Sequence, residues 1–534
     1  MNKRVVVLFF MLTLFLGVLA VRIGILSEGT YLTVSAGANT KSVEMGKTRG
    51  YIYDKDLNPL VNNEKQLVAA IKPTFNSLNL IDEIINDADK PLVIDTISKN
   101  QIAIAESKIM VNKDDVKVSS IIKRYSDCGL APHLIGYLDS DNKGVIGLER
   151  CYNSLLESAN GKLTANCFVD AKGRILEGEP IKIKSHNYNS PMGISLTLSK
   201  SIQEISQNAA LEKGLDKGAI VVLDAKTSEI RAMVSTPTFN QNDVKKSLND
   251  INSPFINRAI TPFAVGSVFK VIVAAAALEK GITPDFSYCC EGKITVDSNY
   301  FNCHKKDGHG TLSLKSAMGE SCNPYFVNLA LQTGAKAICE MGANLGLGSQ
   351  IELADDFYAS GGKMPTSDSV NSNSQLSNLG FGQGDLLSSP LQMAAVYAAI
   401  ANDGVYRSPS LMRAIIDKDK EELQKAELPT DRRVMSSETA KLLNEFLRYT
   451  VEFGSGSKAE NKKCTAAGKT ATAQSGSYNE NGIEINRSWF CGYFPYQNPE
   501  YVIVVMKEDG IGGGTDCAPI FKQIADGIED IEPH

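Results

Sequence analysis

The sequence predicts an α/β chain of the α+β type, in which helices cover an antiparallel sheet. Short apolar runs at 219–223 and 230–234 indicate two strands that pair across a turn. Three more strands are expected towards the other end, at 468–474, 488–493 and 501–506. The long middle is mostly helical, so strands from both ends are expected to meet in one sheet with helices packed on it.

Composition sets the broad class. The chain has 534 residues, of which 43% are hydrophobic and 22% charged, so it is globular and long enough for two or three domains. The formal charge of -6 and the absence of a long basic run give no indication of a nucleic-acid partner.

The N-terminus predicts a membrane anchor at 1–26. Lys3 and Arg4 precede an uncharged apolar run at 5–21, which is just long enough for a bilayer core if Arg22 snorkels outward. The basic flank predicts a cytoplasmic N-terminus, with the remainder of the chain outside the cell. A cleaved signal peptide is the alternative, but residues 19–21 match a cleavage site poorly.

Two further domains are expected after the anchor. Residues 27–190 read as an extracytoplasmic module of short strands and turns, with a linker at 187–191. Residues 191–534 hold the predicted sheet and helices. This second domain begins with a helix around 202–211 and contains another that starts at Ser389-Pro390, a capping box with proline at the first helical position.

A possible nucleophile precedes a buried helix in the second domain. Residues 271–278 are almost entirely apolar, and Gly281 is a suitable helix stop. Ser267 and Lys270 are three residues apart, so they share a helix face. A hydroxyl beside an amine, with free N–H groups at a helix start, is a candidate activated nucleophile.

The same pair also has a structural interpretation, as a helix cap followed by a solvated lysine. The Ser-x-x-Lys spacing recurs at Ser120 and at Ser455, in a charged segment and in a Gly/Ser loop. Only Ser267 opens a buried apolar helix, and further motifs are needed to decide.

Two such motifs follow in order. Ser321-Cys322-Asn323 lies in a predicted loop between helices, where Pro324 is expected to limit what continues after it. Lys469-Thr470-Ala471-Thr472 lies on the predicted strand at 468–474. A chain with Ser-x-x-Lys, then Ser-x-Asn, then Lys-Thr-x resembles the penicillin-recognising serine acyltransferases.

The resemblance extends to the class B penicillin-binding proteins, and to their shorter Gram-positive, clostridial members, because no extra module follows the last predicted strand. It implies the penicillin-binding transpeptidase fold, with a five-stranded antiparallel sheet, behind a β-rich pedestal at 27–190. The other motifs that carry it are Arg49-Gly50-x-Ile52-x-Asp54, His133-Leu134-Ile135-Gly136-Tyr137, Gly147-Leu148-Glu149, Asn257-Arg258-Ala259 and Gly380-Phe381-Gly382-Gln383-Gly384.

This resemblance implies a peptidoglycan D,D-transpeptidase that works through a serine acyl-enzyme and is acylated by β-lactam antibiotics. The implied roles are as follows: Ser267 is the nucleophile, Lys270 its base and Ser321 a proton relay; Asn323 holds the substrate amide; Lys469, Thr470 and Thr472 bind the terminal carboxylate; and the N–H groups of Ser267 and Thr472 form the oxyanion hole.

The implied partners are peptidoglycan stem peptides, β-lactams and the membrane, and a membrane glycosyltransferase is a further one that the resemblance allows. No metal or organic cofactor is required. Three alternatives stay open: a β-lactamase, for which no deacylating residue can be assigned; a non-catalytic β-lactam sensor, which needs several membrane spans; and a structural partner of a cell-wall polymerase.

Two residues depart from the family pattern. Val265 stands where proline is usual, and Ala471 stands where glycine is usual. An added methyl on a strand that faces the ligand is expected to narrow the site and to affect drug affinity more than the chemistry.

The cysteines are eleven in number and scattered, except for Cys289, Cys290 and Cys303, which lie close to His304 and His309. Their spacing fits no standard zinc finger. A disulfide between Cys303 and Cys289 or Cys290 is favoured over a zinc site, with packed free thiols as the remaining alternative.

Overall fold

The computed structural model describes residues 3–27, 39–127, 129–170, 172–188, 190–460, 463, 465–478, 482 and 484–532. Contacts divide the chain into two compact units. The smaller unit comprises residues 1–50, 62–124 and 158–190, and the larger comprises 51–61, 125–157 and 191–534. Residues 28–38 of the predicted pedestal and Asn189 of the predicted linker lie outside the described residues.

The smaller unit contains two antiparallel three-stranded sheets, in the orders β1-β6-β7 and β4-β3-β5. Alternate strand residues pack into two hydrophobic clusters, one of them shared with short helices. Its elements are α1 (Lys3–Ser27), β1 (Thr40–Thr48), β3 (Glu64–Ile71), α3 (Phe75–Leu78), α4 (Ile81–Ile84), α5 (Lys90–Ser98), β4 (Ala103–Glu106), β5 (Val116–Lys123), β6 (Gly161–Phe168) and β7 (Lys182–His186).

Helix α1 fulfils the length requirement for a membrane span. Among the described residues, it is the one helix long and apolar enough to cross a bilayer. It begins at Lys3 and continues past Arg22 to Ser27.

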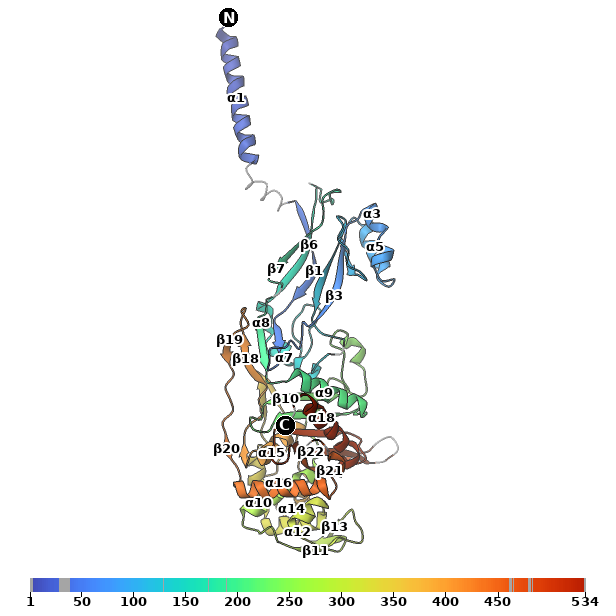
Figure 1. Ribbon diagram of the computed structural model, residues 1–534, viewed down its shortest axis with the longest axis vertical. Helices are drawn as coiled ribbons and strands as arrows, with labels where there is room; N and C mark the ends of the chain where they lie inside the picture. The colour runs from blue at the N-terminus through green and yellow to red at the C-terminus, as the bar shows by residue number, and fades with distance from the viewer. Residues whose placement is uncertain are drawn as a thin grey trace. The chain divides into compact units, whose positions relative to one another are not determined.

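The larger unit is built around the five-stranded antiparallel sheet expected from the sequence, in the order β10-β9-β23-β22-β21. Strands β10, β22 and β21 of this sheet are labelled in Figure 1. Its strands are β9 (Gly218–Asp224), β10 (Ile230–Thr236), β21 (Ala467–Tyr478), β22 (Glu484–Phe494) and β23 (Tyr501–Lys507). The last strand, from near the C-terminus, pairs with β9, so the two ends of this domain meet in the middle of the sheet.

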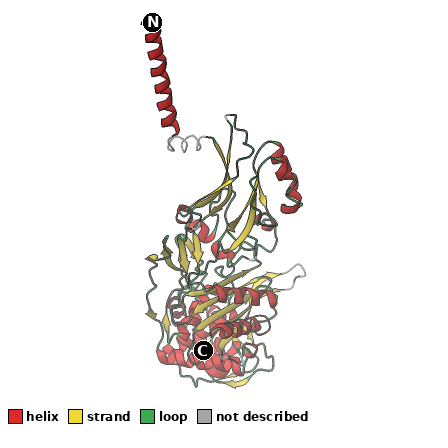
Figure 2. Ribbon diagram, turned by 45° about the horizontal axis from the view of Figure 1, so that its top comes forward, coloured by secondary structure: helices red, strands yellow, loops and turns green. Residues whose placement is uncertain are grey.

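Both faces of this sheet are covered by helices, drawn red in Figure 2. Ile220 and Val222 of β9 pack with α9 (Lys200–Glu212) and α18 (Ala518–Ile531). The alternate residues Val221 and Leu223 belong to the larger cluster on the other face, which includes α10 (Lys270–Glu279), α15 (Pro390–Ala401) and α16 (Ser437–Glu452). A strand that is buried on both sides explains why β9 is a continuous apolar run.

The remaining elements of the larger unit are mostly short. They are β2 (Tyr51–Tyr53), α6 (Pro132–Ile135), α7 (Gly147–Cys151), α8 (Asn153–Ser158), β8 (Gly193–Leu196), η1 (Val244–Ser247), η2 (Gly266–Phe269), β11 (Tyr288–Cys290), β12 (Lys293–Val296), β13 (Asn299–Asn302), β14 (Gly310–Leu312), α11 (Leu314–Gly319), α12 (Asn323–Thr333), α13 (Ala335–Asn344), β15 (Ile351–Ala354), β16 (Phe357–Ala359), α14 (Asn373–Gly380), β17 (Val405–Tyr406), β18 (Met412–Ile416), β19 (Glu422–Lys425), β20 (Arg432–Arg433), η3 (Ser457–Ala459) and α17 (Gly513–Asp516).

Two segments on the N-terminal side of residue 190 belong to the larger unit, namely 51–61 and 125–157. Strand β2 runs parallel to β8, with Tyr51 opposite Gly193, inside the four-stranded sheet β19-β18-β8-β2. The Asp54 carboxylate accepts hydrogen bonds from the N–H groups of Asn58 at 2.8 Å and Lys200 at 3.1 Å. This part of the chain therefore does not follow a division at residue 190/191, because its backbone pairing is with the later segment.

Candidate active site

Ser267 lies in η2, one turn before the buried helix α10, and is half-buried between fully buried neighbours. The preceding Gly266 has φ +60°, and a Cβ there would come within 3.0 Å of the Ala473 Cβ on β21. Its N–H donates to the Gly382 carbonyl at 3.0 Å. A Cβ on Gly382 would in turn lie 1.9 Å from the Gly266 carbonyl oxygen. The glycines of two separate motifs thus allow the backbones beside Ser267 to approach closely.

The helix behind Ser267 ends where the sequence predicted. Gly281 has φ +91° and its N–H donates to the Leu278 carbonyl at 2.9 Å, while the Ile282 N–H donates to the Ala277 carbonyl at 3.0 Å. This left-handed glycine stop confirms the predicted C-terminus of α10.

Lys270 joins two of the predicted motifs directly. Its side chain is completely buried, and its Nζ donates to the Ser321 carbonyl at 2.7 Å and to Asn323 Oδ1 at 2.8 Å. The Ser321 hydroxyl lies 3.3 Å from the same nitrogen, and the Phe326 ring centroid lies 5.3 Å away. The solvated lysine of the structural interpretation is therefore wrong, because this amine is held in the interior.

Burial has a strong effect on the two lysines of the site. It lowers the pKa of Lys270 to about 7, against a smaller upward effect of the Cys322 and Cys303 thiols. The pKa of Lys469 is also lowered well below its ordinary value, by burial first and then by the positive charge of Lys270. A neutral amine at Lys270 is thus accessible near neutral pH.

Ser321 lies between α11 and α12, and Asn323 is the first residue of α12. Ser321 has φ +54°, an uncommon conformation for a residue with a side chain. Both ends of the Asn323 amide are hydrogen-bonded. Its Oδ1 accepts from Lys270 Nζ, and its Nδ2 donates to the Asn302 carbonyl at 3.3 Å. Pro324 does not limit the chain as expected from the sequence: it occupies the first turn of α12, where a missing N–H costs nothing.

The third motif lies on β21, which is an edge strand of the five-stranded sheet. Lys469 is completely buried, and its Nζ donates to the Thr470 carbonyl at 3.2 Å. Thr470 is 7% exposed, whereas Thr472 is exposed. Because β21 packs against η2, the strand brings these side chains towards the segment that carries Ser267.

The sequence did not reveal two contacts of this strand. The Ser455 hydroxyl lies 2.7 Å from that of Thr470, so a serine set aside as a chance Ser-x-x-Lys match belongs to the site. Asp516 accepts hydrogen bonds from the N–H groups of Ile511 at 2.7 Å and Gly512 at 2.8 Å. It thereby fixes a loop in which a Cβ on Gly512 would come within 3.4 Å of Thr472 Oγ1. The glycine run at 512–514 was the available signal of such a close approach.

The two departures from the family pattern are both buried. Val265 is inaccessible to solvent, and Ala471 is 3% exposed within the large hydrophobic cluster. Ala471 lies two residues from Lys469 and shares its face of the strand. Its methyl therefore packs into the protein core, and its effect on drug affinity stays a prediction.

The predicted disulfide of Cys303 is wrong. Cys289, Cys290 and Cys303 are all free thiols, and Cys289 is exposed while Cys290 is buried. Neighbouring residues of a strand face opposite sides, so only one of the pair can face inward. The inward-facing Cys290 meets Cys303, His309 and Cys322 instead.

The titratable residues of the N-terminal motifs have structural roles in this geometry. His133 Nε2 lies 2.6 Å from the Pro254 carbonyl, and burial lowers the pKa of this imidazole to about 4. Glu149 is completely buried and accepts a hydrogen bond from the Tyr125 hydroxyl at 2.9 Å. Together with Asp54, they stabilise turns of the larger unit.

Comparison with known proteins agrees with this arrangement. The family model described as the penicillin binding protein transpeptidase domain matches residues 218–526. Penicillin-binding protein PbpB of Mycolicibacterium smegmatis is 31% identical over 429 residues, which is 76% of this chain and 64% of that protein. Peptidoglycan D,D-transpeptidase MrdA of Haemophilus influenzae is 27% identical, over 98% of this chain and 91% of that protein.

Solved structures give the same result. Penicillin binding protein 3 of Mycobacterium tuberculosis, in complex with aztreonam, is 26% identical with a TM-score of 0.66, and the match covers 92% of this chain and 97% of that one. A peptidoglycan synthase complex contains a chain of the same fold, with a TM-score of 0.70 at 22% identity, over 98% of each chain.

The chain belongs to the penicillin-binding protein transpeptidase family. Its relatives are class B penicillin-binding proteins, so the resemblance inferred from the sequence motifs is confirmed.

The contact between Gly382 and Gly266 yields a first prediction. Gly382→Ala should lower the free energy of unfolding by about 3 kcal/mol or more, since the new Cβ meets a backbone oxygen that cannot move away. Gly384→Ala is the matched control: φ is also positive there, but the nearest atom is 3.5 Å away, and a loss of about 1–2 kcal/mol is expected from backbone strain alone. Equal losses in chemical denaturation of the two variants would contradict the proposed contact.

Proposed function

We propose that the chain is a peptidoglycan D,D-transpeptidase that cross-links stem peptides through a serine acyl-enzyme and is acylated by β-lactams. The observation that carries this proposal is the buried amine of Lys270, bonded to the Ser321–Asn323 turn and one helical turn after Ser267. The relatives named as D,D-transpeptidases support it.

In the first step, the Ser267 hydroxyl attacks the carbonyl between the two terminal D-alanines of one stem peptide. The neutral Lys270 amine takes the hydroxyl proton. The N–H groups of Ser267 and Thr472 stabilise the oxyanion, and Ser321 passes a proton to the departing amine. D-alanine leaves and an ester to Ser267 remains. An amine from a neighbouring stem then attacks this ester, forms the cross-link and restores the serine.

The remaining residues hold the substrate. The second N–H of the Asn323 amide is available for a substrate carbonyl, because among the described residues its Nδ2 has one hydrogen-bond partner, the Asn302 carbonyl. Lys469, Thr470 and Thr472 bind the terminal carboxylate. Lys469 and Thr472 differ in exposure to solvent, which supports different tasks. The buried Lys469 acts through its charge, while the exposed Thr472 hydroxyl donates a hydrogen bond directly to the carboxylate.

The membrane helix completes the proposal. We infer that α1 anchors a single-pass protein with a cytoplasmic N-terminus, that residues 27–190 act as a pedestal apart from 51–61 and 125–157, which belong to the larger unit, and that residues 191–534 carry the transpeptidase outside the cell. The likeness to a chain of a peptidoglycan synthase complex makes a membrane glycosyltransferase the candidate partner. Retained binding of such a partner by an inactive variant would assign it a structural role beside catalysis.

The nucleophile can be tested with a fluorescent penicillin on the purified full chain. Covalent labelling should map to the peptide that contains Ser267 and be lost in Ser267→Ala, which keeps the fold because the side chain is only half-buried. Ser120→Ala is the matched control and should label normally. A labelled peptide containing Ser120 or Ser455 would overturn the assignment.

The base can be tested through pH. Because the pKa of Lys270 is about 7, the rate of penicillin acylation should fall about tenfold per pH unit below that value and level off above it. The rate falls as the pH is lowered because a base that takes the Ser267 proton must be an unprotonated amine. Lys270→Arg should acylate slowly at every pH, since a guanidinium stays charged. A flat rate profile of the unmodified protein between pH 5 and 8 would exclude Lys270 as the base.

Topology can be tested in spheroplasts. Protease added outside should digest the chain beyond α1 and leave an epitope tag at the N-terminus intact. A mature protein that begins near residue 21 would instead show that the segment is a cleaved signal peptide.

A further inference from the structure

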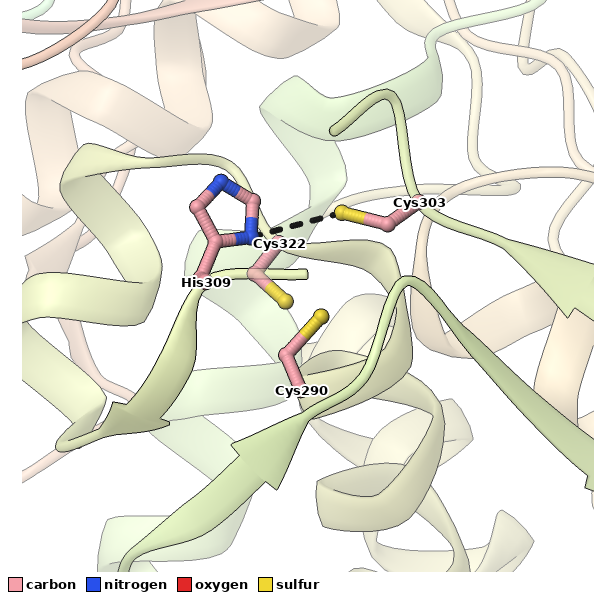
Figure 3. A group of neighbouring side chains, drawn as sticks. All are labelled: Cys290, Cys303, His309 and Cys322. Atoms are coloured by element: carbon pink, nitrogen blue, oxygen red, sulfur yellow. Dashed lines mark hydrogen bonds between the residues drawn. The ribbon is translucent and has the colours of Figure 1, made fainter. Parts of the chain in front are cut away.

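A compact group of soft metal ligands lies beside the Ser321–Asn323 turn. The sulfur atoms of Cys290, Cys303 and Cys322 and a ring nitrogen of His309 all lie within 4.8 Å of one another. Figure 3 shows the three thiols and the imidazole turned towards a shared centre. They come from four separate places: the end of β11, the residue after β13, the segment before β14 and the residue before α12.

The spacing fits a tetrahedral ion. With Zn–S at about 2.3 Å and Zn–N at about 2.0 Å, neighbouring donor atoms of a tetrahedral site are about 3.5–3.8 Å apart. Cys303 Sγ lies 3.4 Å from His309 Nδ1, and the other pairs fall below the 4.8 Å limit. Three thiolates with one imidazole is a donor set that selects zinc over calcium or magnesium.

The second nitrogen of His309 supports the same arrangement. The His309 side chain is 2% exposed, and its Nε2 lies 3.6 Å from the Glu320 carboxylate. Among the described residues, this Nε2 has no hydrogen-bond partner of standard length. A metal-bound imidazole typically directs its other N–H at a carboxylate, which orients the ring and raises its basicity. Glu320 is placed to do so when Nδ1 faces the sulfurs.

A cross-link would stabilise the surrounding segment. Residues 288–312 form two small hairpins, β11-β14 and β12-β13, and their own hydrophobic cluster with α12 is small. A disulfide would use two of the three thiols and leave the third and His309 unsatisfied. A bound cation uses all four donors and offsets the charge of buried thiolates.

We propose that Cys290, Cys303, His309 and Cys322 form a structural zinc site that holds the Ser321–Asn323 turn in place. Four protein ligands leave no open position for water, so the ion is structural and takes no part in the chemistry. Cys322 is the central residue of the turn, and the Asn323 amide bonds to Asn302, the neighbour of Cys303. The ion therefore ties together the two backbones that position Ser321 and Asn323, a consequence that rests on the proposed function.

The site itself can be tested without activity. The full chain, purified in detergent under reducing conditions, should contain one zinc ion per chain by elemental analysis, and X-ray absorption should show three sulfur neighbours at about 2.3 Å and one nitrogen. Cys290→Ser and His309→Asn should lose the zinc. The adjacent, exposed Cys289 and His304 supply matched controls, since Cys289→Ser and His304→Asn should keep it.

Two results would overturn the site. One is an unmodified protein that neither contains zinc nor binds it when titrated; the loss of two hydrogen atoms in intact-protein mass spectrometry would then identify a disulfide. The other is full zinc content in both Cys290→Ser and His309→Asn. Because these measurements need no substrate, they are independent of the transpeptidase proposal.

The positioning role has its own test. Removal of zinc by a chelator should slow penicillin acylation of Ser267 at least tenfold, and added zinc should restore the rate. Ser267→Ala should bind zinc normally while it fails to label, which separates the site from the chemistry. An unchanged acylation rate in zinc-free protein would overturn the positioning role.

Discussion

The buried amine of Lys270 is the interaction on which the candidate site depends. An ammonium group in the interior is costly unless it is hydrogen-bonded, and here its partners are the Ser321 carbonyl and the Asn323 amide. These partners lie on the turn before α12, so the bond joins α10 to α12 across the site. The same burial that makes the charge costly also makes the neutral amine accessible. The Lys270 side chain thus both joins α10 to α12 and offers a neutral amine.

Close backbone contact is the second constraint. Gly266 and Gly382 approach each other so closely that a single Cβ on either would meet backbone or a neighbouring strand. That approach places Ser267 between the α10 helix and the edge strand β21. Strand β21 is one of the two edge strands of the sheet, and an edge strand can pair with an extended ligand. The position of Ser267, the proposed nucleophile, is therefore fixed by residues that have no side chain.

The sequence predicted the parts with strong local signals. The buried strands and the α10 helix with its stop at Gly281 follow from periodicity and turn chemistry, and the three motifs were recognised from their resemblance to a known family. The association of 51–61 with the larger unit was not predictable, because the parallel pairing of Tyr51 with Gly193 is a long-range contact. The same holds for Pro324, whose place in the first turn of α12 was not recognised in the sequence, and for Ser455, which reaches Thr470 only through the fold.

The cysteine cluster shows most clearly why spacing alone was insufficient. A zinc finger presents its ligands on one hairpin and one helix, whereas here each ligand belongs to a different segment and Cys322 was assigned only as the middle of a catalytic triplet. Strand alternation then decides between Cys289 and Cys290, which no spacing rule could do. Because Ser321 has a left-handed backbone and Lys270 needs the Ser321 carbonyl in place, a fixed Cys322 would stabilise a turn that its own conformation does not favour. Metal binding through Cys322 would then constrain the same turn, Ser321 to Asn323, on which the proposed catalytic geometry depends.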